Sequence, residues 1–358
     1  MSCSSEQLKY QVTKLTDMNM QQAVAKVIAG EDLSGPQMTK VMGLIMTGEA
    51  TPAQIGGFLV GLRIKGETVT EITAAATVMR ELATPVKVSG GHLVDTCGTG
   101  GDGTHTFNIS TAAALVTAAA GGQVAKHGNR SVSSSSGSAD VLEALGVRID
   151  LNAGQVASCI EQVGIGFLFA PAHHGAMKHA IGPRRELGAR TIFNLLGPLT
   201  NPAGAPCQLI GVYDQALVEP VAQVLKLLGS ERVLVVCGQD GLDELTITGS
   251  TSVAELKAGQ VSCFELTPEQ LGLSVGTLDA LIVTSAEQSG AMIQQILAGE
   301  PGPARDIVLA NAGAAIYVAG LVNSLQAGVE LAAEVIDNGK AAQTLADLVA
   351  LTQRLGAD

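Results

Sequence analysis

The chain contains no tryptophan, and aromatic residues make up only 3% of its 358 residues. A core with so few rings has to be built from aliphatic and small side chains, which agrees with a hydrophobic fraction of 46% and with 43 glycines. The length is sufficient for one large core or for two domains.

The sequence also lacks paired cysteines, because its six cysteines form no CxxC motif and no spacing typical of a metal site. We therefore expect reduced, mostly buried thiols in a cytoplasmic protein. No basic segment followed by an apolar run opens the chain, so we expect no signal peptide. The cysteines are Cys3, Cys97, Cys159, Cys207, Cys237 and Cys263.

Basic residues are scarce, with 21 Lys and Arg against 33 Asp and Glu and a net charge of −12. This balance argues against nonspecific nucleic-acid binding, which depends on a basic surface. Residues 95–190, however, carry seven Lys and Arg and seven Asp and Glu, so the negative excess lies outside that segment. A small anionic substrate held together with metal ions remains compatible with such a charge distribution.

One long segment, residues 307–329, carries no charged residue and is long enough to span a bilayer. Polar residues interrupt it at Asn311, Asn323, Ser324 and Gln326. Its content of Gly and Ala suits a tightly packed interior helix, so we expect it to belong to the core and not to a membrane.

The most informative segment is a glycine-rich loop at residues 95–111. Leu93 and Val94 before it indicate the end of a strand, and the alanine-rich residues 112–120 after it predict a helix. A strand, a glycine loop and a helix N-terminus together form an anion site, because unpaired backbone N–H groups and the helix dipole both attract negative charge. Phosphate is the ligand that this pattern favours.

The same loop matches the dinucleotide pattern Gly-x-Gly-x-x-Gly at Gly98, Gly100 and Gly103. That interpretation requires an acidic residue about 20 positions later, to hold a ribose hydroxyl. Residues 103–139 contain no Asp or Glu, so the sequence argues against a nicotinamide cofactor.

A second loop of similar design occupies residues 122–137 and adds the cations Lys126 and Arg130. A serine run within it leads to a predicted helix, with Ser138 as the expected N-cap and Gly146 as its end. Clusters of Ser and Gly are usually plain surface loops. Two such loops in tandem, each entering a helix, favour a phosphate site instead.

The two loops, together with residues 184–202 and 240–246, resemble the anthranilate phosphoribosyltransferase family over nearly the whole chain. The resemblance implies transfer of the phosphoribosyl group from phosphoribosyl pyrophosphate to the amine of anthranilate, which gives N-(5′-phosphoribosyl)anthranilate and pyrophosphate in tryptophan biosynthesis. It also implies a requirement for Mg²⁺.

The sequence predicts a helical segment from about Gln7 to about Leu82. Within it, the motifs Ser34-Gly-Pro and Thr51-Pro predict helix starts. From His92 onward, strands alternate with helices, and residues 232–237 are the clearest further strand. We therefore expect an α/β fold with a mostly parallel central sheet. With the resemblance, the expected domains are a small N-terminal helical domain at residues 1–85, with a returning segment near 183–205, and an α/β phosphoribosyl-binding domain at 86–182 and 206–358. The resemblance places the substrates in the cleft between these domains.

The resemblance implies a large set of phosphoribosyl pyrophosphate contacts. Lys126 is the expected phosphate cation, and Asp102 is expected to hydrogen-bond ribose hydroxyls or to orient its loop. The full set is Gly98, Gly101, Asp102, Thr106, Asn108, Ile109, Ser110, Thr111, Lys126, His127, Gly128, Asn129, Arg130, Ser131, Val132, Ser133, Ser134 and Ser138.

Asp243 and Glu244 lie side by side after the expected strand 232–237. By themselves they would be an ordinary solvated acidic pair. The resemblance makes them, with Ser110, the ligands of Mg²⁺, which prefers oxygen donors.

The anthranilate contacts implied by the resemblance are Gly98, Asn129 and Arg184, and a guanidinium suits the carboxylate of anthranilate by geometry. Arg185 is the alternative to its neighbour. No residue is assigned as an acid or base, and the roles of His127, His173 and His174 stay open.

The expected partners are the two small-molecule substrates, with no nucleic acid and no membrane. The resemblance suggests a homodimer through the helical domain, and an association with anthranilate synthase stays open. Two rivals share parts of the pattern: pyrimidine nucleoside phosphorylase, and a non-enzymatic relative that binds nucleic acid. The first should carry different loops, and the second should show a basic surface and eroded metal ligands.

Overall fold

The computed structural model describes residues 18–101, 103–130 and 136–357. The chain divides into two compact units, residues 1–83 with 174–200, and residues 84–173 with 201–358. The sequence-based boundaries lie at 85, near 183 and near 205. The helical unit therefore takes its second segment about nine residues earlier than the sequence indicates.

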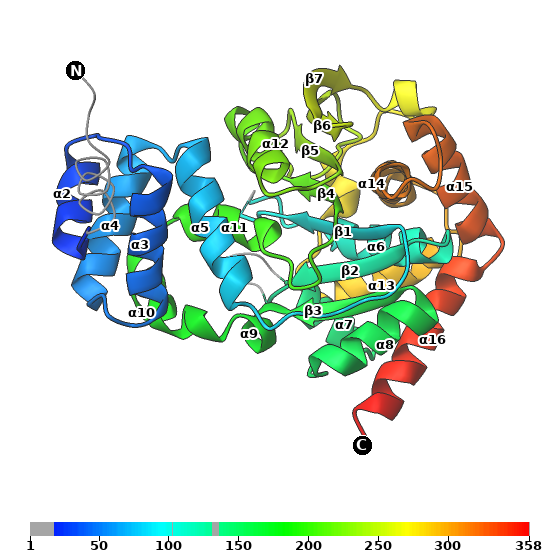
Figure 1. The fold of residues 1–358 in the computed structure, drawn as a ribbon. Helices are drawn as coiled ribbons and strands as arrows, with labels where there is room; N and C mark the ends of the chain where they lie inside the picture. The colour runs from blue at the N-terminus through cyan, green and yellow to red at the C-terminus, as the bar shows by residue number, and fades with distance from the viewer. Residues whose placement is uncertain (1–17, 102, 131–135, 358) are drawn as a thin grey trace. The chain divides into compact units, whose positions relative to one another are not determined.

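The described residues of the smaller unit form helices and no strand (Figure 1). Ser34 and Thr51 are N-caps with Pro in the first turn, as the sequence predicts, and Thr68 caps the helix that ends at Leu82. The first stretch of the predicted helical segment, residues 7–17, lies outside the described residues. Its elements are α2 (Met20–Ile28), α3 (Gly35–Met46), α4 (Pro52–Lys65), α5 (Val69–Leu82), the 3₁₀ turn η1 (Gly175–Met177), α10 (Lys178–Leu187) and α11 (Ile192–Leu199).

The larger unit contains a seven-stranded sheet in the order β3-β2-β1-β4-β5-β6-β7. The first five strands in that order pair in parallel, and β6 and β7 add an antiparallel edge. This confirms the predicted fold class. The strands are β1 (Leu93–Gly98), β2 (Gln123–Gly128), β3 (Ile165–Phe169), β4 (Cys207–Gly211), β5 (Arg232–Gly238), β6 (Thr251–Lys257) and β7 (Gln260–Leu266).

Helices cover this sheet in layers (Figure 1). The helices α6 and α14 pack against the central strands, α8 packs against β2 and β3, and α12 packs against β5, β6 and β7. The helices of the unit are α6 (Ile109–Ala119), α7 (Ser138–Ala144), α8 (Ala153–Val163), α9 (Ala170–His173), α12 (Val218–Leu227), α13 (Ala286–Leu297), α14 (Pro303–Val318), α15 (Leu325–Asp337) and α16 (Lys340–Leu355), with 3₁₀ turns η2 (Gln215–Leu217), η3 (Glu269–Leu271) and η4 (Leu278–Leu281).

The uncharged segment 307–329 belongs to the core, as expected. It forms most of α14, whose residues 307–318 are all buried, and then the start of α15. Two glycines let these helices approach closely, since a Cβ on Gly328 would lie 2.2 Å from the carbonyl oxygen of Gly313. Within the described part of the chain, no helix is long and apolar enough to cross a bilayer.

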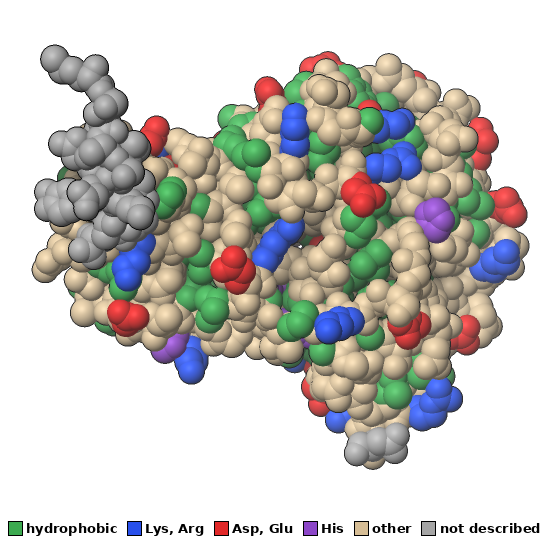
Figure 2. Space-filling model, viewed as in Figure 1, with side chains coloured by type: hydrophobic (Ala, Val, Ile, Leu, Met, Phe, Trp, Pro, Cys, Tyr) green, Lys and Arg blue, Asp and Glu red, His purple; other side chains and the backbone are tan. Residues whose placement is uncertain are grey.

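Charged side chains of both signs are scattered over the face shown in Figure 2, and they do not gather there into a basic patch. This distribution agrees with the net charge of −12. It gives no support to the nucleic-acid-binding alternative on that face.

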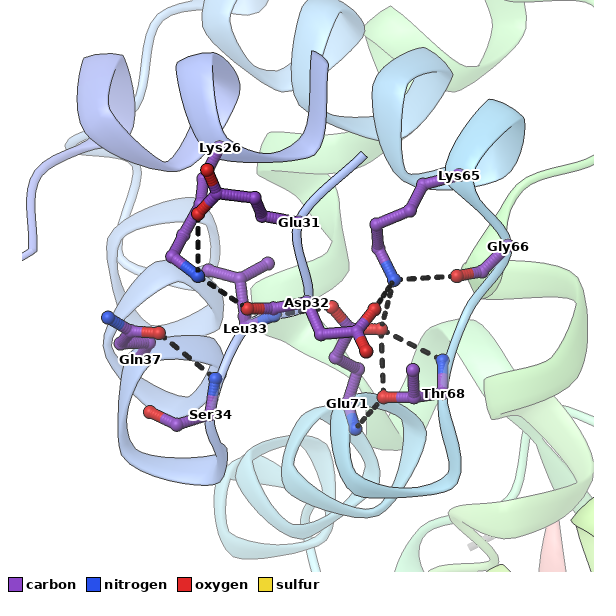
Figure 3. A network of polar contacts seen from close by, with 10 residues as sticks. All are labelled: Lys26, Glu31, Asp32, Leu33, Ser34, Gln37, Lys65, Gly66, Thr68 and Glu71. Carbon is purple, nitrogen blue, oxygen red and sulfur yellow. Dashed lines mark hydrogen bonds and ion pairs between the residues drawn. The ribbon is translucent and has the colours of Figure 1, made fainter. Parts of the chain in front are cut away.

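A buried ion pair ties the helical unit together (Figure 3). The side chain of Glu71 is fully buried and accepts hydrogen bonds from Lys65 Nζ at 2.9 Å, from the N–H and hydroxyl of Thr68, and from the N–H of Leu33. Burial alone would lower the pKa of Lys65, but hydrogen bonds with Asp32 and Glu71 outweigh that effect and raise it. One carboxylate therefore joins the loop before α3, the end of α4 and the start of α5.

Glu71→Gln should destabilise this unit by about 3 kcal/mol, because it leaves the buried ammonium of Lys65 without its buried counter-charge. Amide hydrogen exchange in α3 and α5, followed by mass spectrometry, measures the loss. The matched control is Glu31→Gln, which breaks the more exposed ion pair with Lys26. It should change the free energy of unfolding obtained from the exchange by less than about 1 kcal/mol. Equal effects of the two substitutions would contradict this assignment.

Candidate functional site

The site lies at the carboxyl ends of the central strands of the α/β unit. From β1 the chain proceeds through α6 to β2 on one side, and it later returns to β4 on the other side of β1. In open α/β sheets ligands bind where the strand order reverses in this way, outside the carboxyl ends of the strands. The sequence placed the end of the first strand at Val94, whereas β1 continues to Gly98 because it pairs with β4 up to Gly211.

Asp243 sits against the ends of β1 and β4. Its Oδ2 accepts a hydrogen bond of 2.7 Å from the N–H of Gly100, 143 residues away in the chain. A Cβ at Gly98 would lie 2.2 Å from that same oxygen, and a Cβ at Gly211 would lie 1.4 Å from the carbonyl oxygen of Asp243. Both strands therefore need glycine at their last position for this carboxylate to reach the glycine loop.

Side-chain hydrogen bonds fix the segment that contains Asp243. The side chain of Asn311 in α14 accepts from the N–H of Leu245 and donates to its carbonyl oxygen, each at 3.0 Å. The hydroxyls of Thr246 and Thr248 both donate to Asp240 Oδ2 at 2.6 Å. These contacts fix the main chain on both sides of the neighbouring Glu244, whose exposed fraction is 9%.

Lys126 connects the two predicted loops. Its ammonium is buried and donates to the carbonyl oxygen of Thr96 at 2.7 Å and to Ser110 Oγ at 3.2 Å. Ser110 lies in the first turn of α6, where the N-cap Asn108 makes no side-chain capping bond, and the N-terminus of a helix attracts negative charge. A full positive charge and a helix N-terminus thus lie at the same point.

The charges around Lys126 influence one another. Burial lowers the pKa of Lys126, while the charges of Asp95 and Glu244 act to raise it. Burial and the neighbouring charge of Asp95 raise the pKa of the Cys97 thiol well above its usual value. The thiol next to the glycine loop is therefore protonated at neutral pH and is no nucleophile.

The second loop is only partly described, because Ser131, Val132, Ser133 and Ser134 lie outside the described residues, as does Asp102 of the first loop. The guanidinium of Arg130 binds Asp140 and Glu143 of α7, at 2.9 and 2.5 Å. The cation that the sequence predicts at this position is thus paired with acids of its own unit.

Ser138 was wrongly predicted as the N-cap of α7. The N-cap is Gly137, whose N–H donates to Asp140 Oδ2 at 2.9 Å, and Ser138 is the first helical residue. Its hydroxyl instead packs against the second loop, because a Cβ at Gly128 would lie 2.2 Å from Ser138 Oγ.

The structure brings several predicted residues of the α/β unit together, namely Gly98 with Asp243 and Lys126 with Ser110. Thr106 lies farther along the first loop, where it forms a backbone bridge with Ile282. Sequence reasoning missed Gly211 in β4, Asp95 in β1, and Asn201 in the loop before β4. A glycine that ends an apolar strand is the signal that would have pointed to Gly211.

Arg184 belongs to α10 of the helical unit, with its guanidinium 5.0 Å from the centre of the Phe193 ring. Burial lowers its pKa, although an arginine stays charged at neutral pH. The buried His173, in the other unit, faces the carbonyl oxygen of Thr84 through Nδ1 at 3.2 Å. Burial lowers the pKa of His173, which favours a neutral structural imidazole.

The oxygen donors of Asp243, Glu244 and Ser110 suit a hard cation. Among the described residues, no cluster of three or more His, Cys, Asp and Glu is present, which argues against a site of the zinc type there. The two adjacent carboxylates and the serine hydroxyl offer only oxygen, which is the preference of Mg²⁺. The residues present therefore fit magnesium with phosphate oxygens completing its coordination.

Comparison with known proteins gives one consistent answer. Residues 90–342 match the model for the α/β domain of a glycosyl transferase family, and residues 21–83 match the helical bundle domain of the same family. An anthranilate phosphoribosyltransferase from Thioalkalivibrio sulfidiphilus is 63% identical over 335 residues, which cover 94% of this chain and 99% of that protein. The enzyme from Alkalilimnicola ehrlichii is 62% identical, over 94% of this chain and its own full length.

Solved structures agree. The anthranilate phosphoribosyltransferase of Thermus thermophilus is 46% identical, with a TM-score of 0.88 over 92% of this chain and 99% of that one. The Saccharomyces cerevisiae enzyme, in complex with phosphoribosyl pyrophosphate and Mg, is 25% identical, with a TM-score of 0.84 over 95% of this chain and 99% of that one.

Gly98→Ala should weaken the binding of pyrophosphate in the presence of Mg²⁺ by about tenfold or more, equivalent to ~1.4 kcal/mol. The reason is that the added Cβ displaces the Asp243 carboxylate. Isothermal titration calorimetry measures this affinity. Gly91→Ala is the matched control, because a Cβ there meets nothing within 4 Å. Unchanged affinity in Gly98→Ala would show that the position of Asp243 does not matter.

Proposed function

Because the chain belongs to the anthranilate phosphoribosyltransferase family, we propose that it transfers the phosphoribosyl group of phosphoribosyl pyrophosphate to the amine of anthranilate. The products are N-(5′-phosphoribosyl)anthranilate and pyrophosphate, and the reaction belongs to tryptophan biosynthesis. The observation that supports the proposal most strongly is the close contact of Asp243 with Gly98 and Gly211. This contact lies beside the glycine loop that leads into α6.

The chemistry requires positioning and electrostatic stabilisation more than a strong base. The bond from ribose C1 to pyrophosphate breaks as the amine nitrogen attacks, so negative charge accumulates on the leaving group and positive charge on the ribose. We assign Lys126 and the N-terminus of α6 to stabilise the departing pyrophosphate, and the contact of Lys126 with Ser110 in the first turn of that helix supports this. No side chain is assigned as an acid or base: the amine of anthranilate attacks as the neutral group, and the proton that its nitrogen then loses passes to water.

We assign Asp243, Glu244 and Ser110 as the residues that hold Mg²⁺ together with the pyrophosphate. Their donor atoms are all oxygens, and the yeast relative was solved with phosphoribosyl pyrophosphate and Mg. When bound, the metal neutralises charge on the pyrophosphate. Asp243 is oriented for this task by the N–H of Gly100.

Arg184 is assigned to the carboxylate of anthranilate, because a guanidinium can bind a carboxylate with two parallel hydrogen bonds. A structure of the yeast relative contains 4-fluoroanthranilate, which carries the same carboxylate. Gly98 and Asn129 are further assigned contacts of the acceptor. The remaining phosphoribosyl contacts, including the serine run, keep the roles that the resemblance implies.

A homodimer and a cytoplasmic location complete the proposal. Support for the location comes from the cysteines, since Cys97, Cys159, Cys207, Cys237 and Cys263 are all free thiols. Gel filtration coupled to light scattering tests the dimer.

The fluorescence of anthranilate tests the reaction directly. The purified chain is mixed with anthranilate, phosphoribosyl pyrophosphate and Mg²⁺, and we expect a fluorescence decay that requires all three and stops with EDTA. A folded protein that gives no decay would contradict the proposal. Turnover of pyrimidine nucleosides with inorganic phosphate would then identify the phosphorylase alternative.

The double variant Asp243→Asn with Glu244→Gln should lose about 100-fold or more of its Mg²⁺-dependent turnover, because the carboxylate charge that holds the metal is removed. Initial rates across a Mg²⁺ series measure the effect. Glu330→Gln with Glu334→Gln, which neutralises two exposed carboxylates of α15, is the matched control and should retain full activity. Full activity in the first variant would refute the metal assignment.

Arg184→Ala should raise the KM for anthranilate by about tenfold or more, since a hydrogen bond to a charged group contributes ~1.5–3 kcal/mol. The KM for phosphoribosyl pyrophosphate should change far less. Arg185→Ala provides the comparison, because Arg185 is an exposed neighbour on the same helix. Equal effects of Arg184→Ala on both substrates would exclude the carboxylate role, and a larger effect at Arg185 would transfer it there.

A further inference from the structure

The backbone pairing between the neighbouring strands β1 and β2 stops before these strands reach the site. Between β1 and β2 only Leu93 pairs with Gln123 and Val94 with Val124. Beyond that point β1 pairs only with β4, up to Gly98, and β2 pairs only with β3, up to Gly128. Residues 95–98 and 125–128 thus lack backbone pairing with each other; we call this stretch the wedge, and its backbone groups need other partners.

Polar side chains fill this wedge and replace the missing ladder. Asp95 Oδ1 accepts from the N–H of His127 at 3.2 Å, Lys126 Nζ donates to the carbonyl oxygen of Thr96 at 2.7 Å, and Asn201 Nδ2 donates to the carbonyl oxygen of Ala125 at 2.7 Å. Asp95, Lys126 and Asn201 have exposed fractions of 0%, 2% and 5%. All three are thus built into the core and are not surface contacts.

Asp95 occupies the centre of this network. Besides the N–H of His127, its carboxylate accepts the thiol hydrogen of Cys97 at 3.5 Å. Burial raises the pKa of Asp95, whereas Asn201, Lys126 and the N–H of His127 act to lower it. The charges of Asp95 and Lys126 act on each other, and Glu244 is the other carboxylate whose charge acts on Lys126. A buried carboxylate is costly unless it is hydrogen-bonded and close to an opposite charge, so its presence here calls for a role.

We propose that Asp95 is a positioning residue for the transfer reaction. It holds the end of β2 through the N–H of His127, and it keeps the Lys126 ammonium directed at Ser110 at the N-terminus of α6. Asp95 acts through Lys126 and the main chain and touches no substrate itself. This inference rests on the proposed function of Lys126 and Ser110 in the phosphoribosyl site.

Asp95→Asn tests the proposal, because asparagine keeps an oxygen for the N–H of His127 but removes the charge that acts on Lys126. We expect kcat/KM for phosphoribosyl pyrophosphate to fall about 10- to 100-fold, the range typical of residues that orient a ligand-binding group. The KM for anthranilate should change less than about twofold. Asp306→Asn, which neutralises a half-buried carboxylate in the first turn of α14, is the matched control and should leave both values unchanged.

A double-mutant cycle with Lys126→Met separates positioning from general support of the fold. If Asp95 acts through Lys126, adding Asp95→Asn to Lys126→Met should lower kcat/KM by less than about threefold. The same large fall in both backgrounds would overturn the proposal. So would a lower Tm with kcat/KM per folded molecule unchanged, because that result indicates a purely structural role.

Two further comparisons keep the test decisive. Should Asp95→Asn not fold, Asp95→Glu keeps the charge but moves it by one methylene, and the same selective loss is expected. Should the wild-type chain show no transferase activity, the proposed function fails on its own. The affinity for pyrophosphate with Mg²⁺, measured by calorimetry, then decides the role of Asp95: a tenfold loss in Asp95→Asn supports it, and an unchanged affinity overturns it.

Discussion

The site depends on one close approach, that of the segment around Asp243 to the ends of β1 and β4. A Cβ at Gly211 would lie 1.4 Å from the carbonyl oxygen of Asp243, so the main chain of Asp243 can approach β4 this closely only if residue 211 is glycine. That contact brings the Asp243 carboxylate to the N–H of Gly100. The anchoring of Leu245 by Asn311, and through it by α14, ties this arrangement to the core of the larger unit.

A second constraint is electrostatic. Lys126 is almost completely buried, and its ammonium is accommodated by a carbonyl oxygen, a hydroxyl and the nearby charges of Asp95 and Glu244. A cation in such surroundings attracts an anion more strongly than one in water, because the local dielectric constant is lower. The polar side chains in the wedge replace the backbone bonds that are missing between β1 and β2. The same features that support the sheet therefore prepare an anion site.

Local patterns in the sequence predicted the parts of the fold that local physics determines. The alanine-rich run became α6, the Ser34 and Thr51 caps start helices, and residues 232–237 form most of β5. The prediction missed features that depend on distant residues. The extension of β1 to Gly98 depends on pairing with β4, and the partners of Arg130 lie on a helix that follows the loop. For the site, the motifs supplied the candidate residues through family resemblance, whereas the support from Asp95 and Asn201 is visible only in three dimensions.

Anomalous diffraction from crystals grown with Mn²⁺ and phosphoribosyl pyrophosphate tests the central claim most directly, since Mn²⁺ accepts the same oxygen ligands as Mg²⁺ and scatters anomalously. The account predicts a Mn²⁺ peak within coordination distance of Asp243 or Glu244, about 2.0–2.4 Å, with the pyrophosphate beside Lys126. A peak bound only by other residues, or a pyrophosphate bound elsewhere in an otherwise unchanged structure, would contradict the account.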